Sequence, residues 1–263
     1  MKLILASEKD PAAMNIVSRL LELYDHERTT DERHFQMGED LSMEVIKEES
    51  TEITALSQQA DEVIVASRHA SDSGRPSLTV HAPGFLERGE LALASPRTIK
   101  LALAALKAEV ESLGLQFEVS LEATHHGPAG LGVPVTFVEI GSGPEQWADR
   151  RAGEAVAHAI MKAATSDVKC LNAAGLGGPH YAPRHTEVTL NTEVGVGHIL
   201  PKYVNFDAGL VELAVRRTSG GVNLLLLDWK GLSEPQRKVC LRAAEVLGIR
   251  VERAGEIARR KKL

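Results

Sequence analysis

The chain has 263 residues, 43% of them hydrophobic, which is enough to bury one sizeable core and is ordinary for a soluble globular protein. Its formal net charge of -6 excludes a global positive field, so any nucleic acid must be bound by a local basic patch. Only 4% of the residues are aromatic, so aliphatic side chains must fill the core.

The N-terminal half shows helix signals separated by short apolar runs. An N-cap acceptor followed by proline marks a helix start at Asp10 and again at Ser95, and Gly114 marks the end of the second helix. Residues 25–60 are polar, acidic and weakly periodic, and we assign them no element and no function. The predicted elements, in chain order, are a strand at residues 2–7, a helix from 10 to 23, strands at 62–67 and 77–81, and a helix from 95 to 113.

The same alternation continues in the C-terminal half. It predicts strands at residues 117–123 and 135–140, a helix at 145–164, a strand at 168–174, a helix at 207–217, a strand at 222–228, a helix at 233–247 and a short strand at 249–252. Alternating strands and helices favour a single α/β domain over residues 1–263, with a mostly parallel or mixed central sheet flanked by helices. Residues 253–263 are expected to form a solvated basic tail.

Several classes of protein are excluded by what the sequence lacks. Cys170 and Cys240 have no CxxC spacing and lie in apolar contexts, so we expect buried free thiols in a reducing cytoplasm. No run of 18 apolar residues occurs, so no membrane contact is expected. The motifs GxGxxG, GxxxxGK[ST] and GxSxG are also missing. We therefore expect no nucleotide cofactor and no serine hydrolase of the α/β-hydrolase type.

Polar clusters follow the predicted strands at their C-terminal ends. His69 follows the strand at 62–67, His125 and His126 follow the strand at 117–123, and Glu139 closes the strand at 135–140. His180 follows the strand at 168–174 through a glycine-rich turn. Because sites in open α/β sheets form outside the carboxyl ends of the strands, these clusters predict one shared pocket.

Histidine is concentrated between residues 69 and 198. Neutral imidazole suits zinc, and a carboxylate from Glu122, Glu139 or Glu187 could complete the ligand set. The same imidazoles could instead act as general bases, or be unrelated surface and core histidines. The seven histidines of this stretch are His69, His81, His125, His126, His180, His185 and His198. Zinc is the expected cofactor, and its candidate ligands are His81, His126, His180 and His185.

Two local features affect how such a pocket could be built. His125 and His126 would point to opposite faces of a strand, so both can reach one centre only if the backbone turns, and Gly127-Pro128 offers a turn. Gly177 and Gly178 have two equal interpretations. They could present backbone N–H groups to a phosphate or an oxyanion, or they could simply form a tight turn after a strand.

Five stretches between residues 66 and 203 resemble the archaeal and plant type of D-aminoacyl-tRNA deacylase. They are ASRHASDSGRPSLTVHAPG (66–84), EATHHGP (122–128), FVEIGS with Gln146 and Trp147 (137–147), GLGGPHYAPRHTE (175–187) and GHILPKY (197–203). The resemblance implies an archaeal, zinc-containing enzyme that acts on D-aminoacyl-tRNA, and we expect it to be a cytoplasmic monomer. It also implies an α/β fold similar to peptidyl-tRNA hydrolases and nucleoside phosphorylases.

The implied reaction is hydrolysis of the ester between a D-amino acid and the terminal ribose of tRNA, which serves chiral proofreading. Under this hypothesis Glu139 orients a histidine or binds the substrate ammonium group, and backbone N–H groups near Gly127 or Gly177 hold the oxyanion. The candidate catalytic residues are His69, His125, His126 and Glu139. The candidate substrate contacts are Arg68, Thr124, Gly127, Gly177, Gly178, Tyr181, Arg184 and Lys202.

Two other function classes stay open from the sequence. A phosphorylase- or nucleosidase-like enzyme could use the same crevice, with Gly177 and Gly178 on phosphate, and its activity would depend on phosphate. A non-catalytic RNA-binding module is the other alternative. The low aromatic content disfavours base-stacking platforms, and a histidine-rich pocket would have no purpose in such a module.

Overall fold

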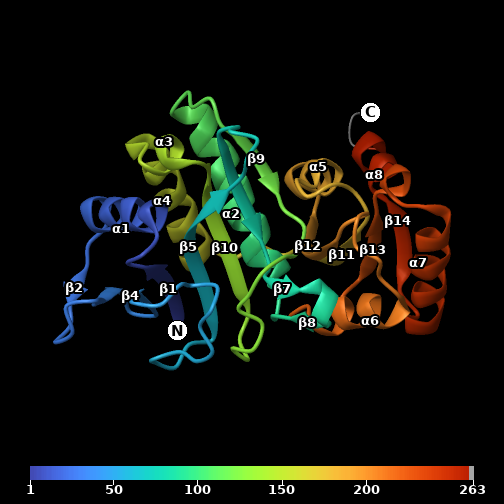
Figure 1. The fold of residues 1–263 in the computed structure, drawn as a ribbon, viewed down its shortest axis with the longest axis horizontal. Helices are drawn as coiled ribbons and strands as arrows, with labels where there is room; N and C mark the ends of the chain where they lie inside the picture. Colours follow the sequence, from blue (N-terminus) through green and yellow to red (C-terminus); the bar gives the residue numbers. More distant parts are fainter. Residues whose placement is uncertain (261–263) are drawn as a thin grey trace.

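The computed structural model describes residues 1–260 and contains two β-sheets that lie side by side (Figure 1). The larger sheet is mixed, because most neighbours in its middle are parallel whereas two pairs at one end and one inner pair are antiparallel. This confirms the predicted α/β class with a mixed central sheet. The spatial order of its strands is β2 (Glu27–Arg28), β3 (His34–Gly38), β4 (Leu41–Ile46), β1 (Lys2–Ser7), β5 (Glu62–Ala70), β10 (Val135–Ser142), β6 (Ser77–His81) and β9 (Glu118–Leu121).

The smaller sheet is entirely parallel and lies in the part of the chain coloured orange to red in Figure 1. Strand and helix alternation does not distinguish one sheet from two, because it says nothing about which strands pair. A short hairpin, β7 (Gly84–Phe85) with β8 (Glu90–Leu91), stands beside this sheet. The strand order of the smaller sheet is β12 (Val194–Leu200), β11 (Leu171–Leu176), β13 (Leu224–Leu227) and β14 (Arg250–Arg253).

The helices begin where the sequence places capping residues. The Asp10 side chain accepts hydrogen bonds from the N–H groups of Ala12 and Ala13, and Ser95 caps the second long helix through the N–H of Thr98. The helices are α1 (Pro11–Leu23), α2 (Pro96–Ser112), α3 (Pro144–Trp147), α4 (Arg150–Thr165), α5 (Pro183–Asn191), α6 (Ala208–Arg216), α7 (Glu234–Leu247) and α8 (Ala254–Arg260), with 3-10 turns η1 (Leu86–Arg88) and η2 (Trp229–Gly231).

Three expectations about elements are corrected. The helix expected at 145–164 is broken into α3 and α4, because Asp149 takes an extended conformation and caps α4. Residues 25–60, which received no element, contain β2, β3 and β4. The expected solvated tail instead forms the end of β14 and then α8, which buries Ala254 and Ala258. The last part of that tail, residues 261–263, lies outside the described residues.

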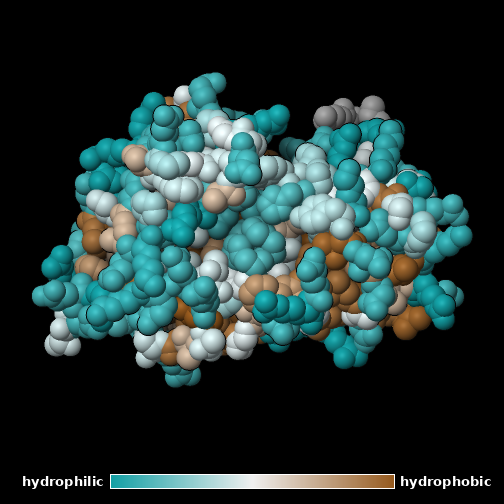
Figure 2. Space-filling model, viewed as in Figure 1, coloured by the Kyte–Doolittle hydropathy of each residue, from teal (hydrophilic) through white to brown (hydrophobic). Residues whose placement is uncertain are grey.

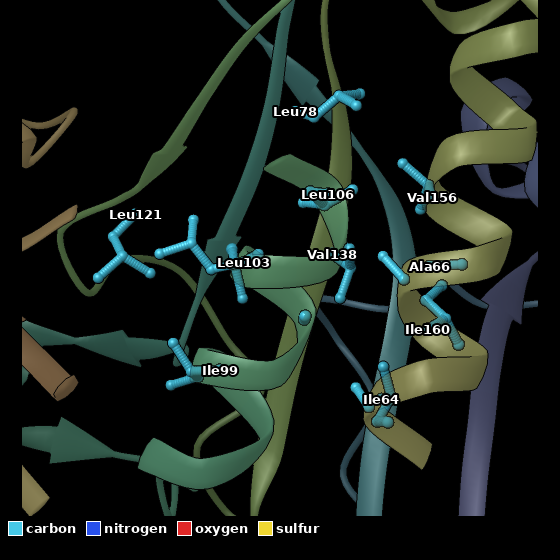
Figure 3. Close-up of a cluster of buried hydrophobic side chains, with 14 of the residues drawn as sticks. Ile64, Ala66, Leu78, Ile99, Leu103, Leu106, Leu121, Val138, Val156 and Ile160 are labelled. Atoms are coloured by element: carbon cyan, nitrogen blue, oxygen red, sulfur yellow. The ribbon is translucent and has the colours of Figure 1, made fainter. Parts of the chain in front are cut away.

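The main core lies between one face of the larger sheet and the helices α1, α2 and α4. Figure 3 shows Ile99, Leu103 and Leu106 of α2 opposite side chains from β5, β6 and β10, with Val156 and Ile160 of α4 beside them. These helices bring an aliphatic face at helical spacing to the sheet, as the periodicity predicts. The same core continues into one face of β11, β12 and β13, so it is shared by both sheets.

The opposite face of the larger sheet changes from apolar to polar along its strands. On β5, Val63 and Val65 are buried under a loop, whereas Ser67 and His69 follow on the same face two and four residues later. On β10, Phe137 is followed in the same way by Glu139. The polar ends of these strands therefore lie together, next to the buried apolar part of the same sheet face.

Both cysteines are free, and Cys240 is buried as expected, but Cys170 is only partly buried. Within residues 1–260 no helix has the length and apolar character needed to cross a membrane. The face shown in Figure 2 is largely hydrophilic, with apolar atoms gathered near α6 and the β7–β8 hairpin.

Replacing Leu103 with alanine should lower the free energy of unfolding by about 2–5 kcal/mol, because the fully buried side chain would leave a cavity between α2 and the sheet. Urea denaturation monitored by circular dichroism measures the change. The control is Leu241→Ala on α7, where the leucine is 45% exposed and the expected loss is under about 1 kcal/mol. Equal stability of the two variants would contradict this packing.

Candidate active site

Three neighbouring strands of the larger sheet present polar side chains on one face. Glu139 on β10 lies opposite Ser67 of β5 on one side and Thr79 of β6 on the other, and directly opposed residues point to the same face. His69 and His81 stand two residues beyond Ser67 and Thr79, so they share that face. The sheet register therefore brings two imidazoles and a carboxylate together.

A close approach of β5 and β10 positions His69. Its pairing partner is Gly141, where an added β-carbon would come within 2.8 Å of His69 Cδ2 and 2.6 Å of Ser77 Oγ. Glycine is therefore needed to leave space for the imidazole. The indole N–H of Trp147 on α3 donates to the backbone carbonyl of His69 at 3.1 Å, which holds the strand from the other side.

The loop after β9 supplies three further polar groups. Glu122 follows the strand directly, and His125 and His126 come three and four residues later. His126 has φ 40°, in the left-handed region that is uncommon for residues other than glycine. This turn brings the two neighbouring imidazoles to the same side, with ring centroids 4.3 Å apart. The need for a turn was correctly predicted, and it occurs at His126 itself as well as at Gly127-Pro128.

The segment after β11 completes the group. Tyr181 forms an isolated β-bridge with Glu122, and its hydroxyl lies 2.7 Å from Nε2 of His69. The adjacent His180 has its Nδ1 3.1 Å from the hydroxyl of Tyr203. Both tyrosines therefore hold an imidazole by its outer nitrogen and leave the inner nitrogen facing Glu122.

Glu122 lies at the centre of these side chains and is 1% exposed. Its Oε1 is 3.0 Å from Nδ1 of His69. Its Oε2 is 3.5 Å from Nε2 of His125 and 3.6 Å from both Nε2 of His180 and Nδ1 of His81. Four imidazoles from four different segments thus surround one buried carboxylate.

Glu139 is a second buried carboxyl group beside the first. Its Oε2 lies 3.5 Å from the hydroxyl of Thr79 and 3.7 Å from Nδ1 of His69. Its Oε1 has no hydrogen bond and is 4.0 Å from Nε2 of His126. Two carboxyl groups this close inside a protein do not ionise equally.

Burial sets the protonation of the imidazoles. It lowers the pKa of His69 and of His126, and it lowers the pKa of His125 to about 4 with a further contribution from His126. The pKa of His81, which is surrounded by other imidazoles, is lowered most strongly by the same cause. These four histidines are therefore neutral near pH 7, the form that binds metals and accepts protons.

The pKa values of the two carboxyl groups are shifted in opposite directions. Burial raises the pKa of Glu139 well above its usual value, and the negative charge of Glu122 raises it further. Burial also acts to raise the pKa of Glu122, but the close contact with His180 and the other nearby imidazoles outweigh it, so that pKa is lowered. Near neutral pH, Glu122 is the ionised group and Glu139 is the neutral acid, a separation typical of catalytic pairs.

The donor set fits a zinc ion. One atom each from His69, Glu122, His125 and His180 can be chosen so that all lie within 4.8 Å of one another. Both oxygens of Glu122 are buried without a hydrogen bond. His125 donates its Nδ1–H to the carbonyl of Ala123 at 2.8 Å, so its Nε2 lone pair faces Oε2 of Glu122. Two acceptors in that arrangement repel each other unless a cation or a proton lies between them, and a neutral imidazole supplies no proton there.

A cavity of 350 Å³ opens onto this cluster. It is lined by the cluster residues His69, His125, His126, Glu139 and His180. Further lining residues come from the start of α1, from the end of β5 and from the segment after β4: Asp10, Glu49, Ser50, Thr51, Ser67, Arg68 and Ala70. Arg68, a predicted substrate contact, therefore lies at the cavity, where its Nη2 is 3.4 Å from Glu49 Oε2.

His185 is not part of the cluster, and its prediction as a zinc ligand is wrong. Pro183 begins α5, and this helix turns His185 into the core. There its Nε2 donates to the carbonyl of Leu226 at 3.2 Å. The predicted ligands His81, His126 and His180 do lie in the cluster, as do His69 and His125, which were predicted as catalytic residues.

Thr124 cannot contact a substrate as predicted. Its side chain is 1% exposed, and its hydroxyl accepts the N–H of Ile199 at 3.1 Å and lies 3.0 Å from Nδ1 of His198. Thr124 instead joins the loop after β9 to β12 of the smaller sheet. Gly127 is also buried, and an added β-carbon would come 2.5 Å from the carbonyl oxygen of the cavity residue Thr51.

Gly177 and Gly178 form a tight turn and not an anion cradle. Gly177 donates its N–H to the carbonyl of Leu200 at 2.8 Å, and Gly178 donates to the carbonyl of Gly231 at 3.3 Å. Both have φ near +90°, where side chains are strained, and a β-carbon on Gly177 would be 2.6 Å from Leu232. The predicted oxyanion or phosphate role is wrong because both donors are already used.

The last two predicted substrate contacts lie elsewhere. Arg184 and Lys202 line a separate cavity at the end of the smaller sheet, together with Glu187, which pairs with Arg184 at 2.8 Å. Glu187 is therefore not the carboxylate of the histidine cluster.

Sequence reasoning missed the central position of Glu122 and the contribution of Tyr203. Glu122 was considered only as one of three carboxylates that could complete a metal site, although it lies two residues before the Thr124-His125-His126 run. Tyr203 ends the resembling stretch 197–203 but received no role, because its contact with His180 depends on the pairing of β11 with β12. The unassigned region 25–60 also supplies Glu49, Ser50 and Thr51 to the cavity.

Known proteins resemble this chain in sequence and in fold. Residues 56–252 match the family model described as D-aminoacyl-tRNA deacylase. The D-aminoacyl-tRNA deacylase of Pyrococcus furiosus is 36% identical over 95% of this chain and 98% of its own, and that of Archaeoglobus fulgidus is 33% identical over 98% of both. A crystal structure described as a conserved protein of unknown function is 32% identical and superposes with a TM-score of 0.90, covering 98% of this chain and 97% of the other.

His198, a buried histidine outside the cluster, predicts a pH dependence of stability. Burial lowers its pKa to about 4, and its Nε2 donates to the carbonyl of Ala92 at 3.0 Å. Because the unfolded chain binds this proton near pH 6.5, the stabilising contribution is complete above pH 6.5 and is lost as the pH falls towards 4.

Urea titrations between pH 7.5 and 4.5 test this point. Relative to the wild type, His198→Gln should lose less stability on acidification, with a difference of roughly 3 kcal/mol over the full window. Parallel pH profiles for the two proteins would show that His198 does not titrate in this way.

Proposed function

This chain belongs to the D-aminoacyl-tRNA deacylase family, and on that premise we propose that it hydrolyses the ester between a D-amino acid and the terminal ribose of tRNA, releasing both. The observation that carries the proposal is the buried Glu122 with its ring of neutral imidazoles, open to a cavity at the edge of the larger sheet. Ester hydrolysis near neutral pH needs an activated water and a stabilised oxyanion, and this group offers both kinds of chemistry.

His126 is the proposed general base. Its Nδ1 donates to the carbonyl of Gly127 at 2.7 Å, so its Nε2 carries the free lone pair. Its lowered pKa keeps that nitrogen unprotonated near pH 7. The protonated carboxyl of Glu139, whose Oε1 is 4.0 Å from Nε2 of His126, can give its proton to the leaving ribose oxygen and regain one from His126 after that imidazole has taken a proton from the attacking water.

Zinc is the proposed cofactor, held by Glu122 with His69, His125 and His180. When bound, it would lower the pKa of a coordinated water to about 7 and polarise the ester carbonyl. Tyr181 and Tyr203 hold the outer nitrogens of His69 and His180, which keeps both inner nitrogens directed at Glu122. Such outer contacts commonly tune metal affinity by about 10–100-fold.

The part of the cavity lined by Glu49, Ser50 and Thr51 is the proposed place for the amino acid. Glu139 is neutral and therefore attracts the substrate ammonium weakly, while the Asp10 carboxylate already accepts hydrogen bonds from α1 and Arg68. Glu49 is the remaining carboxylate that lines the cavity, and its contact with Arg68 is long, at 3.4 Å, and uses Oε2. We infer that it faces the ammonium group, and that this part of the cavity leaves no room for an L side chain, so selectivity arises from a steric clash.

The sequence left a phosphate-dependent nucleosidase open, and no observation favours it. Its expected phosphate contacts, Gly177 and Gly178, use both N–H groups within the fold. A cytoplasmic location and a monomeric state remain predictions that go with the proposed activity.

Amino acid release should be rapid from D-tyrosyl-tRNA and at least 100-fold slower from L-tyrosyl-tRNA, because only the D side chain fits the cavity wall. A chelator should abolish release and added zinc should restore it. Radiolabelled amino acid measured after acid precipitation of the tRNA gives both rates.

Equal rates on the two substrates would contradict chiral selectivity. D-selective release that survives chelation would contradict the zinc proposal and leave His126 as the group that activates the water. Inactivity towards both substrates would contradict the proposed function.

Glu122→Gln should weaken zinc binding at least 10-fold, because an amide lacks the negative charge that the imidazoles surround. Competition with a fluorescent zinc chelator measures the affinity without reference to activity. The matched control is Glu187→Gln, a carboxylate that belongs to the separate cavity and should bind zinc as the wild type does. Equal affinity of both variants would remove Glu122 from the metal site.

A further inference from the structure

A second cavity, of 530 Å³, lies where the strands of the smaller sheet end and is strongly basic. It is bounded by the turn after β11, by η2, by the start of α5 and by α8. Five cationic side chains line it against three carboxylates. The basic residues are Arg184, Lys202, Lys230, Arg253 and Arg259, and the acidic ones are Glu187, Asp228 and Glu256.

The carboxylates of this cavity are already engaged, whereas two lysines are not. Glu187 pairs with Arg184, and Glu256 pairs with Arg253 at 3.2 Å. Within residues 1–260, Lys202 and Lys230 have no ion pair, and both are exposed. In a chain of net charge -6, this is a local concentration of available positive charge.

The guanidinium of Arg253 is held in place by an aromatic ring. It lies over Trp229 with 4.1 Å between the guanidinium carbon and the ring centroid, a cation–π distance. Positioned cations of this kind are suited to an ordered anionic ligand, because less side-chain freedom is lost when the ligand binds.

This basic cavity adjoins the histidine cluster through two chain segments. Pro179 lines the basic cavity and the next residue, His180, lines the catalytic cavity. Lys202 lines the basic cavity and the next residue, Tyr203, contacts His180. Consecutive Cα atoms are only about 3.8 Å apart, so a ligand of modest length can occupy both places.

We propose that the basic cavity binds the backbone phosphates of the 3′-terminal nucleotides of the RNA, while the ester on the terminal ribose lies at the histidine cluster. This rests on the proposed function. Backbone phosphates follow the terminal ribose at short intervals, and lysine and arginine neutralise them without reading sequence. Lys202 and Lys230 make the phosphate contacts, and Arg253 supplies a fixed third charge.

Lys230→Glu tests the proposal, because this side chain is exposed and the substitution replaces a positive charge in the cavity with a negative one. The probe is a fluorescent RNA minihelix with a single-stranded 3′ end that carries no amino acid, titrated at several salt concentrations. We expect about 10-fold weaker binding and a slope of log affinity against log salt that is smaller by about 1. The KM for D-tyrosyl-tRNA should rise while kcat stays within about twofold.

The matched control is Lys169→Glu, an exposed lysine just before β11 and therefore at the opposite end of the same strand. It should bind the minihelix as the wild type does. Wild-type affinity and salt slope in Lys230→Glu would overturn the proposal. So would calorimetry in which inorganic phosphate binds to the wild type and not to Lys230→Glu while minihelix affinity is unchanged, because the cavity would then be a small-anion site.

The two proposals fail separately. Loss of minihelix binding in Lys230→Glu together with a wild-type protein that is inactive on D-tyrosyl-tRNA would keep the RNA site and contradict the proposed reaction. Full D-selective activity together with unaltered RNA binding in Lys230→Glu would keep the proposed reaction and contradict the RNA site.

Discussion

Glu122 carries a buried negative charge, and a charge removed from water must be compensated by nearby groups. His69, His125 and His180 reach it from three separate parts of the chain, and because the Nε2 lone pair of His125 cannot compensate a negative charge, a cation held among these side chains fits the site. Each imidazole is held on its far side by a hydroxyl or a backbone carbonyl, so its inner nitrogen faces the carboxylate. Removing any one of these supports would leave a buried polar atom without a partner.

The segment that carries Glu122 also joins the two sheets. The segment 121–124 leaves the larger sheet and is bonded along its length to the smaller one. Ala123 donates to the carbonyl of His180 at 2.8 Å, and Thr124 donates to that of Ile199 at 3.0 Å. The Glu122 backbone bridges to Tyr181 between these contacts. The active-site candidates are therefore built on paired backbone and not on a free loop, which favours accurate placement.

Much of the fold follows from local signals. The helix starts at Asp10 and Ser95, and the strands at 2–7 and 77–81, were predicted at their observed places, because caps and apolar runs are encoded by neighbouring residues. The separation into two sheets was not predicted, because strand pairing is a long-range property. The strand β12 was missed because its glycines dilute the apolar pattern.

The candidate site was predicted in outline for a related reason. Histidines at strand ends meet at one edge of a sheet, so most of the set could be recognised from the sequence. His185 was misassigned because a helix start at Pro183 turns it inward. Gly177 and Gly178 were ambiguous because only the tertiary structure shows which carbonyls accept their N–H groups. Which carboxylate occupies the centre likewise depends on packing.

The location of the reaction centre is the central claim, and a crystal structure with a non-hydrolysable 3′-(D-tyrosylamino)adenosine tests it most directly. The amide carbonyl should lie in the cavity lined by His69, His126 and Glu139, with the D side chain towards Thr51. An analogue bound elsewhere, with this cavity free of it in a protein that is active on D-tyrosyl-tRNA, would contradict the account.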